Sequence, residues 1–313
     1  MKEEKILSII KSVIGDKYIG DDCAYIKDLG IIVSQDSLVE DVHFSLKYIT
    51  PYQLGYKSAM VNISDISASG GEGRYITVAL SLPKNITDNF VKEFYEGLSN
   101  ALKKCGNIEV IGGDITGSDK IMVSITIIGI DKNRKISSRS HAQTGQVIVT
   151  SGVHGSSAIG LKMLLSNKNF DDKYKNLFIP AHLMPEAQVQ FSKNISKNIQ
   201  ENYAMMDSSD GLADTLYKIA TASNKTLVVD FNKIEYEKEL EELFPENYVD
   251  MILFGGEDYQ IIATIPEELA NKFGMNIIGR VVDKIQNEPV KILNVSGGIR
   301  IIKDLEKCFN HFE

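Results

Sequence analysis

The chain has 313 residues, with 34 basic and 42 acidic side chains and a formal net charge of −8. It contains no basic block that would neutralise a run of phosphates, which argues against a nucleic-acid partner. Its three cysteines, Cys23, Cys105 and Cys308, are far apart and form no C-x-x-C pair, so neither a zinc site nor a disulfide framework is supported. The length favours two domains of ordinary size.

The first predicted element is a helix, because apolar residues recur at helical spacing between residues 6 and 13. Lys11 interrupts this apolar run, so we interpret the segment as an amphipathic helix and not as a signal peptide. The most apolar stretch, residues 121–130, is far too short to cross a bilayer. These features predict a soluble protein of the cytoplasm without a membrane partner.

Carboxylates gather at two places around the first predicted strand. The turn at residues 20–25 holds two adjacent aspartates and is either a plain turn or part of a site. The strand that begins at Ile31 runs to Asp36, and an acidic loop follows as far as Phe44. This loop offers groups that ligate a hard cation or contact a polar substrate. A solvated loop between two strands explains the same pattern.

A long helix is predicted from Pro51, and the glycines at residues 70–73 end it. Asn62 and Asp65 are three residues apart and therefore share a face of this helix. Asp65 stands among apolar residues, where an unpaired charge is too costly to be incidental. It is either capped and structural or directed to a metal.

Paired glycines mark the end of a later strand. The predicted elements here are a strand at 74–82, a helix at 90–102 capped by Thr87, and strands at 108–111 and 121–130. Gly112 and Gly113 allow a ligand to approach the backbone closely, and Asp114 follows at once. The structural alternative is a hairpin turn into the next strand.

The polar stretch at residues 131–145 is the predicted domain boundary, which we place between residues 138 and 139. A strand at 146–150 leads into a glycine-containing loop, and a helix begins near Ser156. Free N–H groups at such a helix start can bind phosphate. The loop equally fits a plain turn with Ser156 as the helix cap, and it is not a P-loop because it contains no Gly-Lys-Ser/Thr.

The most informative local motif is Asp207-Ser208-Ser209-Asp210-Gly211, directly before a predicted helix. Two aspartates three residues apart can bind metal ions while the helix dipole faces an anion, whereas a simple N-cap needs only one Asp or Ser. The segment Gly255-Gly256-Glu257-Asp258-Tyr259, before a predicted strand at 261–265, repeats the pattern of glycines followed by acids.

Taken together and in this order, the motifs resemble those of the thiamine-monophosphate kinases, a family of the aminoimidazole ribonucleotide synthetase-like superfamily. The matching pieces are Gly20-Asp21-Asp22, Ser34-Gln35-Asp36 through His43-Phe44, Asn62-Ile63-Ser64-Asp65, Gly112-Gly113-Asp114, Arg139-Ser140, Asp207-Ser208-Ser209-Asp210-Gly211, Gly255-Gly256-Glu257-Asp258-Tyr259 and Phe309-Asn310-His311-Phe312. The resemblance implies an α+β protein with a two-domain aminoimidazole ribonucleotide synthetase-like fold. Residues 1–138 would form an N-terminal metal- and ATP-binding domain whose mixed sheet dimerises, and residues 139–313 a C-terminal α/β domain for substrate and ATP.

The resemblance also implies the site residues and the ligands, which are ATP, thiamine monophosphate and several Mg²⁺ ions. The implied metal ligands are Asp22, Ser34, Gln35, Asp36, Asp65, Asp114, Asp207 and Asp210. The implied ATP contacts are Gly113, Asp114, Arg139 and Ser209, and the implied substrate contacts are His43, Glu257 and Phe309. The transfer would be metal-assisted, with no catalytic side chain, in a homodimer.

The expected chemistry suits these residues. A phosphate monoester is largely a dianion at neutral pH and needs no general base. Two polyanions need charge neutralisation and alignment, which Mg²⁺ and arginine supply in phosphoryl transfer. Glu257 and Phe309 would suit a cationic thiazolium ring.

Three departures from the family pattern leave alternatives open. Gln35 stands where the family usually has threonine, Gly73 replaces a usual proline, and Ala187 follows Pro185-Glu186 where an arginine is expected. The alternatives are a related ATP-dependent ligase or cyclase of the same superfamily, and an ATP-binding relative without catalysis.

Overall fold

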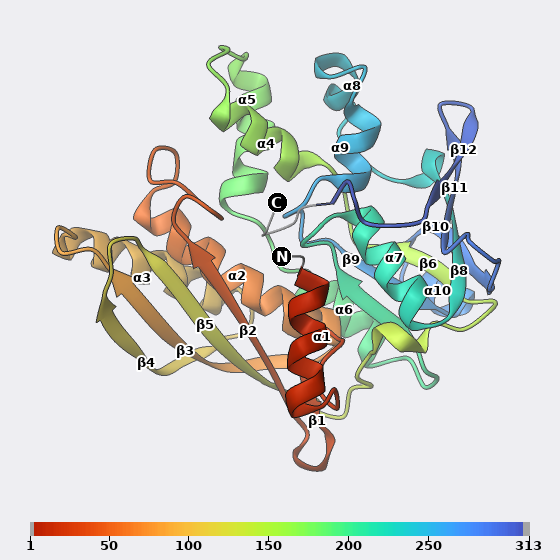
Figure 1. Cartoon of the computed structure of the whole chain (residues 1–313), viewed down its shortest axis with the longest axis horizontal. Coiled ribbons are helices and arrows are strands. Elements are labelled where there is room, and N and C mark those ends of the chain that lie inside the picture. Colours follow the sequence, from red (N-terminus) through yellow and green to blue (C-terminus); the bar gives the residue numbers. More distant parts are fainter. Residues whose placement is uncertain (1–2, 309–313) are drawn as a thin grey trace.

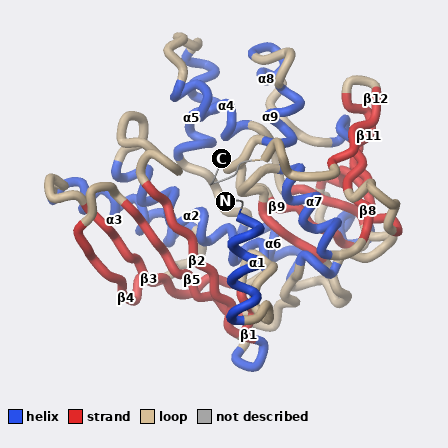
Figure 2. Tube along the Cα trace, in the orientation of Figure 1, coloured by secondary structure: helices blue, strands red, loops and turns tan. Residues whose placement is uncertain are grey.

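The computed structural model describes residues 3–308 and contains two β-sheets with helices around them (Figures 1 and 2). The first sheet has the strand order β1-β2-β5-β3-β4 and the second the order β12-β11-β8-β10-β6-β9-β7. Figure 1 shows the first sheet on the left and the second on the right. The predicted α+β class is therefore confirmed.

The N-terminal sheet is mixed, because β3 and β4 run parallel while its other pairs are antiparallel. Its strands are β1 (Ala24–Ile26), β2 (Ile31–Val39), β3 (Glu72–Leu82), β4 (Glu109–Gly117) and β5 (Met122–Ile130). The helices of this part are α1 (Glu3–Ile14), α2 (Pro51–Ser69) and α3 (Asp88–Lys104).

The C-terminal part surrounds its sheet with shorter helices. The strands are β6 (Val147–Thr150), β7 (Ala204–Asp207), β8 (Lys225–Asp230), β9 (Ile261–Ile265), β10 (Asn276–Asp283), β11 (Val290–Val295) and β12 (Gly298–Ile302). The helices are α4 (Ser156–Leu165), α5 (Asp172–Leu183), α6 (Val189–Ser196), α7 (Leu212–Ala222), α8 (Glu239–Leu243), α9 (Tyr248–Phe254) and α10 (Glu267–Lys272). Across residues 3–308, no helix combines the length and the apolarity that a membrane span requires.

Helix α2 is the central element of the molecule and is buried along most of its length. It starts with a capping box, in which the Thr50 side chain and Gln53 satisfy each other's main-chain N–H groups, and it ends at Gly70 in the left-handed region. Its contact with α3 is close enough that a Cβ at Gly97 would lie 1.9 Å from the main-chain oxygen of Tyr52. In Figure 1, α2 extends from behind the first sheet toward the second.

Two expectations about strands 108–111 and 121–130 are corrected by the sheet. Strand β4 pairs in parallel with β3, while β5 pairs with β2 and β3, so the hairpin between β4 and β5 is wrong. The Gly112-Gly113-Asp114 motif also lies within β4 and not at its end.

The predicted end of the first long strand is also corrected. Strand β2 continues to Val39, so the predicted acidic loop begins three residues later than expected.

Candidate active site

Three of the predicted aspartates meet where the two parts of the molecule join. Asp22 precedes β1, Asp65 lies on α2, and Asp207 is the last residue of β7. One carboxylate oxygen from each lies within 4.8 Å of those of the other two. Three segments that are far apart along the chain therefore bring three oxygen ligands together. We refer to Asp22, Asp65 and Asp207 as the acidic cluster.

Serine hydroxyls hold two of these carboxylates in place. Ser34 Oγ donates to Asp65 Oδ2 at 2.5 Å, and Ser64 Oγ donates to Asp207 Oδ2 at 2.5 Å. Ser64 lies on α2 and Asp207 on β7, so the second bond also ties the two parts of the protein together. Asp36 lies nearby on β2, with its N–H donating to Asn62 Oδ1 at 3.1 Å.

The acidic cluster is electrostatically strained. Burial, reinforced by repulsion from neighbouring aspartates, holds the pKa of Asp65 well above its usual range and raises the pKa of Asp207 to about 7. Burial also raises the pKa of Asp22, against the opposing effect of Arg139, whose guanidinium lies 2.6 Å from Asp22 Oδ1. Asp207 Oδ1 is buried without a hydrogen-bond donor among residues 3–308.

These observations fit a bound divalent cation. The cluster supplies only oxygen ligands, which Mg²⁺ prefers, and a cation would relieve the repulsion and satisfy Asp207 Oδ1. The sequence-predicted ligands Asp22, Ser34, Asp36, Asp65 and Asp207 all belong to this region.

Asp210 lies on the same loop as Asp207, but its carboxylate pairs with Lys218 Nζ at 3.0 Å. Lys218 also contacts Asp214 at 2.8 Å. Ser209, a predicted ATP contact, accepts a main-chain hydrogen bond from the N–H of Glu257. The loops that contain Asp207 and Glu257 are therefore in direct contact.

Gln35 and Asp114 are not brought to the acidic cluster within one chain. Side chains alternate across a strand, so Gln35 faces away from Ser34 and Asp36. Gln35 instead hydrogen-bonds Ser124 and Thr126 on the outer face of the first sheet. An amide ligand from Gln35 is therefore not supported in this arrangement.

Asp114 lies on that same outer face, together with Ser37. Pairing joins Ser37 to Ser124, Ser124 to Ala79 and Ala79 to Asp114. Three interstrand steps of about 4.8 Å place Asp114 roughly 14 Å from the Ser37 position of β2. Gly113 belongs to the same edge strand and is likewise remote from the acidic cluster.

The three predicted substrate contacts lie in different surroundings. The Glu257 carboxylate is ion-paired with Lys57 and lies 3.2 Å from His182 Nδ1. His43 follows β2, and its Nδ1 accepts from the N–H of Val39 at 3.1 Å. Phe309 lies outside the described residues.

The glycine loop before α4 has a different role from either predicted one. The N–H groups of Gly155 and Ser157 donate to the carboxylate of Asp258 at 2.6 and 2.9 Å. Asp258 therefore caps α4, and the alternative with Ser156 as the cap is wrong. The helix start is already occupied by a carboxylate.

Lys57 and His182 were missed by the sequence reasoning. A lone lysine in a helix is normally a solvated side chain, so only its place among apolar neighbours signalled burial. His182 offered no signal, because its partner Glu257 is 75 positions away.

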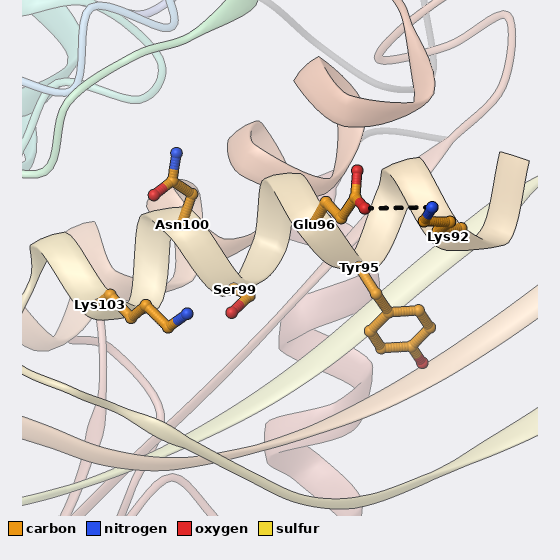
Figure 3. A pocket seen from close by; sticks show the side chains of 6 residues that line it. All are labelled: Lys92, Tyr95, Glu96, Ser99, Asn100 and Lys103. Carbon is orange, nitrogen blue, oxygen red and sulfur yellow. Dashed lines mark ion pairs between the residues drawn. The ribbon is translucent and has the colours of Figure 1, made fainter. Parts of the chain in front are cut away.

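A pocket on α3, formed by Lys92, Tyr95 and neighbouring residues of that one helix (Figure 3), contains none of the site residues.

Comparison with known proteins identifies the class. Residues 20–130 match the family model described as AIR synthase related protein, N-terminal domain. The chain is 38% identical over 313 residues to thiamine-monophosphate kinase of Bacillus subtilis (strain 168), covering 95% of this chain and 94% of the relative. It is 34% identical over 284 residues to the Aquifex aeolicus (strain VF5) enzyme of the same name, covering 88% and 90%.

Solved structures agree with these matches. A structure described as AaThiL complexed with AMPPCP and TMP superposes with a TM-score of 0.88 at 32% identity, covering 99% of this chain and 97% of that one. A HypE structure in complex with ATP has a TM-score of 0.69 at 18% identity, covering 88% and 86%, and shares the fold alone.

The family-model match and the structural similarity thus place the chain among proteins related to AIR synthase. Within that class, the chain belongs to the thiamine-monophosphate kinase family.

Proposed function

We propose that this protein transfers the terminal phosphoryl group of ATP to thiamine monophosphate, forming thiamine diphosphate. The observation that carries the proposal is the acidic cluster, in which three elements from both parts of the protein supply carboxylates to one point. Membership of the thiamine-monophosphate kinase family supports the choice of acceptor. The name of a similar structure, which includes AMPPCP and TMP, supports the same pair of ligands.

The residues have separate tasks in this proposal. Asp22, Asp65 and Asp207 would hold Mg²⁺, which when bound neutralises the phosphates and aligns them for in-line transfer. Arg139 donates to Asp22 beside the acidic cluster, and its guanidinium would contact the ATP phosphates there. No residue needs to take a proton from the acceptor, because the monophosphate is already largely a dianion.

We also propose a homodimer whose partner completes the site. Strand β4 is an edge strand, and all of its residues are exposed. Exposed apolar side chains lie on it and on the next two strands of the sheet, β3 and β5, which marks an interaction surface. These side chains are Tyr75, Val110, Ile111, Ile115 and Met122. Asp114, remote from its own acidic cluster, would then serve the cluster of the partner.

The proposed location is the cytoplasm. The three free cysteines suit this compartment because it is reducing.

The test of the reaction is a coupled assay for ADP and thiamine diphosphate. The protein is incubated with ATP, Mg²⁺ and thiamine monophosphate, with unphosphorylated thiamine in parallel. We expect product from the monophosphate alone, because the site is built to receive a second phosphate. ATP binding without product from either acceptor would overturn the thiamine assignment.

A further inference from the structure

Lys57 is a buried cation that the reaction described above does not use. It lies on α2 with no exposed surface, and lysine is almost never fully buried unless it is paired. Its Nζ lies 3.2 Å from both Glu257 Oε1 and Glu257 Oε2. One ammonium group thus contacts both oxygens of one carboxylate, across the junction between α2 and the C-terminal part.

The main chain around Glu257 is held in a demanding conformation. Glu257 has a φ of 64° and Tyr259 a φ of 50°, in the left-handed region that side chains other than glycine rarely adopt. The N–H of Glu257 donates to the oxygen of Ser209 at 2.6 Å. A Cβ at Gly256 would lie 2.8 Å from that same oxygen. Such strain persists where the surrounding structure fixes it, and it is concentrated at functional sites.

His182 contacts the same carboxylate but adds no charge. Its Nδ1 lies 3.2 Å from Glu257 Oε2, and it is buried. Burial, together with the nearby Lys57, lowers the pKa of His182 to about 4, so the imidazole is neutral at pH 7. Lys57 therefore supplies the charge that compensates Glu257 inside the protein.

The carboxylate keeps one side for a ligand. An ionised carboxylate offers about four acceptor positions. Lys57 Nζ donates to Oε2 and lies equally close to Oε1 as an ion pair, while His182 Nδ1 lies 3.2 Å from Oε2; both partners are buried side chains. The Glu257 side chain is still 25% exposed. Acceptor capacity that Lys57 does not use thus remains on a carboxylate whose side chain is partly accessible.

We propose that Lys57 is a positioning residue of the acceptor pocket, which orients the Glu257 carboxylate so that its exposed side receives the cationic ring of thiamine monophosphate. The proposal rests on the function proposed above and names a residue that acts through Glu257 without touching the ligand. Lys57 and Ser64 are seven residues apart on α2, about 10 Å along the helix. The same helix thus supports the phosphate end of the acceptor near Asp65 and the ring end near Glu257.

The test is a double-mutant cycle in the coupled assay, with Lys57→Met, Glu257→Gln and the double variant. We expect Lys57→Met to raise KM for thiamine monophosphate about tenfold or more, with KM for ATP unchanged and kcat within about twofold. In the Glu257→Gln background, adding Lys57→Met should change KM no further, because Lys57 acts only through the carboxylate.

Lys104→Met is the matched control. Lys104 Nζ also bridges to an acid of the C-terminal part, at 2.5 Å from Glu186 Oε1, but the lysine is 58% exposed. This variant should keep both KM values. If one single variant does not fold, because it leaves a buried charge unpaired, the double variant still folds because both charges are gone. Its KM for thiamine monophosphate is then compared with that of the single variant that folds, and equal values support the positioning role.

Two results would overturn the positioning role. The first is an equal rise in both KM values, or a fall in kcat alone, in Lys57→Met. The second is a full additional effect of Lys57→Met in the Glu257→Gln background. Either would mark Lys57 as purely structural. Absence of product with the unmutated protein would instead overturn the proposed function, so the two failures are distinguishable.

Discussion

At the scale of single residues, the acidic cluster lowers the stability of the folded protein. Asp22, Asp65 and Asp207 repel one another in a buried place, where charges are normally avoided. The local pattern around each aspartate left a structural alternative open, and only the ordered set of motifs, through its family resemblance, selected all three together. The motifs could not show that Gln35 and Asp114 face the opposite side of the sheet, since that depends on strand pairing between distant segments.

The raised pKa of Asp207 predicts how stability depends on pH without metal. Its folded-state pKa is about 7 against an ordinary 3.8, so folding favours the protonated form. This contribution is fully present below about pH 4 and is lost as pH rises to about 7, at up to about 1.4 kcal/mol per pH unit. In EDTA, urea unfolding should show Asp207→Asn losing stability less steeply than the unmutated protein. Equal slopes would contradict the prediction.

Neutralising a single carboxylate should abolish the reaction while the fold remains. We expect Asp65→Asn to lower turnover by more than about 100-fold, because even the partners of metal ligands are worth 10–100-fold. Circular dichroism should be unchanged, since the variant removes a repelling charge and keeps the shape. Asp172→Asn, on a side chain 85% exposed on α5, is the control and should be fully active. Normal turnover in Asp65→Asn would refute the assignment.

At the scale of elements, local signals predicted α2 well and the path of β4 poorly. The spacing of its apolar residues, Pro51 at its start and Gly70 at its end predicted this helix. Strand β4 was misplaced because two strands close in sequence suggest a hairpin, whereas β5 inserts between β2 and β3. The residues of a strand predict the strand itself but not which other strand will pair with it.

The α2–α3 contact offers a prediction about this element. Gly97→Ala places a Cβ against the main chain of Tyr52, so the helices must separate. We expect a loss of about 1–3 kcal/mol in the free energy of unfolding, measured with urea. Gly298→Ala is the control, because a Cβ there meets only the main-chain oxygen of Val295, at 3.6 Å, an ordinary van der Waals distance. Equal stability of the two variants would contradict the prediction and show that α2 and α3 can separate at little cost.

At the scale of the whole molecule, the position of Asp114 in the first sheet conflicts with its implied role as a metal ligand. The residue belongs to the implied metal ligands but lies across the sheet from them. The symmetric dimer proposed above would resolve this conflict by bringing the exposed edge of one copy to the cluster of the other. The boundary at residues 138 and 139 stays a prediction, although each sheet has its own buried core.

Mixing two inactive variants tests the shared site. If Asp114 acts in the partner, Asp65→Asn and Asp114→Asn subunits form mixed dimers with one intact site each. Random exchange of equal amounts after mild unfolding and refolding should restore about one quarter of full activity, because half the dimers are mixed. Ultracentrifugation checks that dimers form. No recovery in verified mixed dimers would place Asp114 in its own subunit's site.

The ion pair between Lys57 and Glu257 has a consequence for how acceptor choice can change between relatives. The carboxylate lies in the C-terminal part, but the group that orients it lies on α2 in the N-terminal part. Grafting onto this chain a C-terminal half that lacks the Glu257 carboxylate would leave the buried ammonium of Lys57 without its counterpart. A switch of acceptor during evolution therefore requires coordinated substitutions on both sides of the junction, so the two halves cannot be inherited as independent modules.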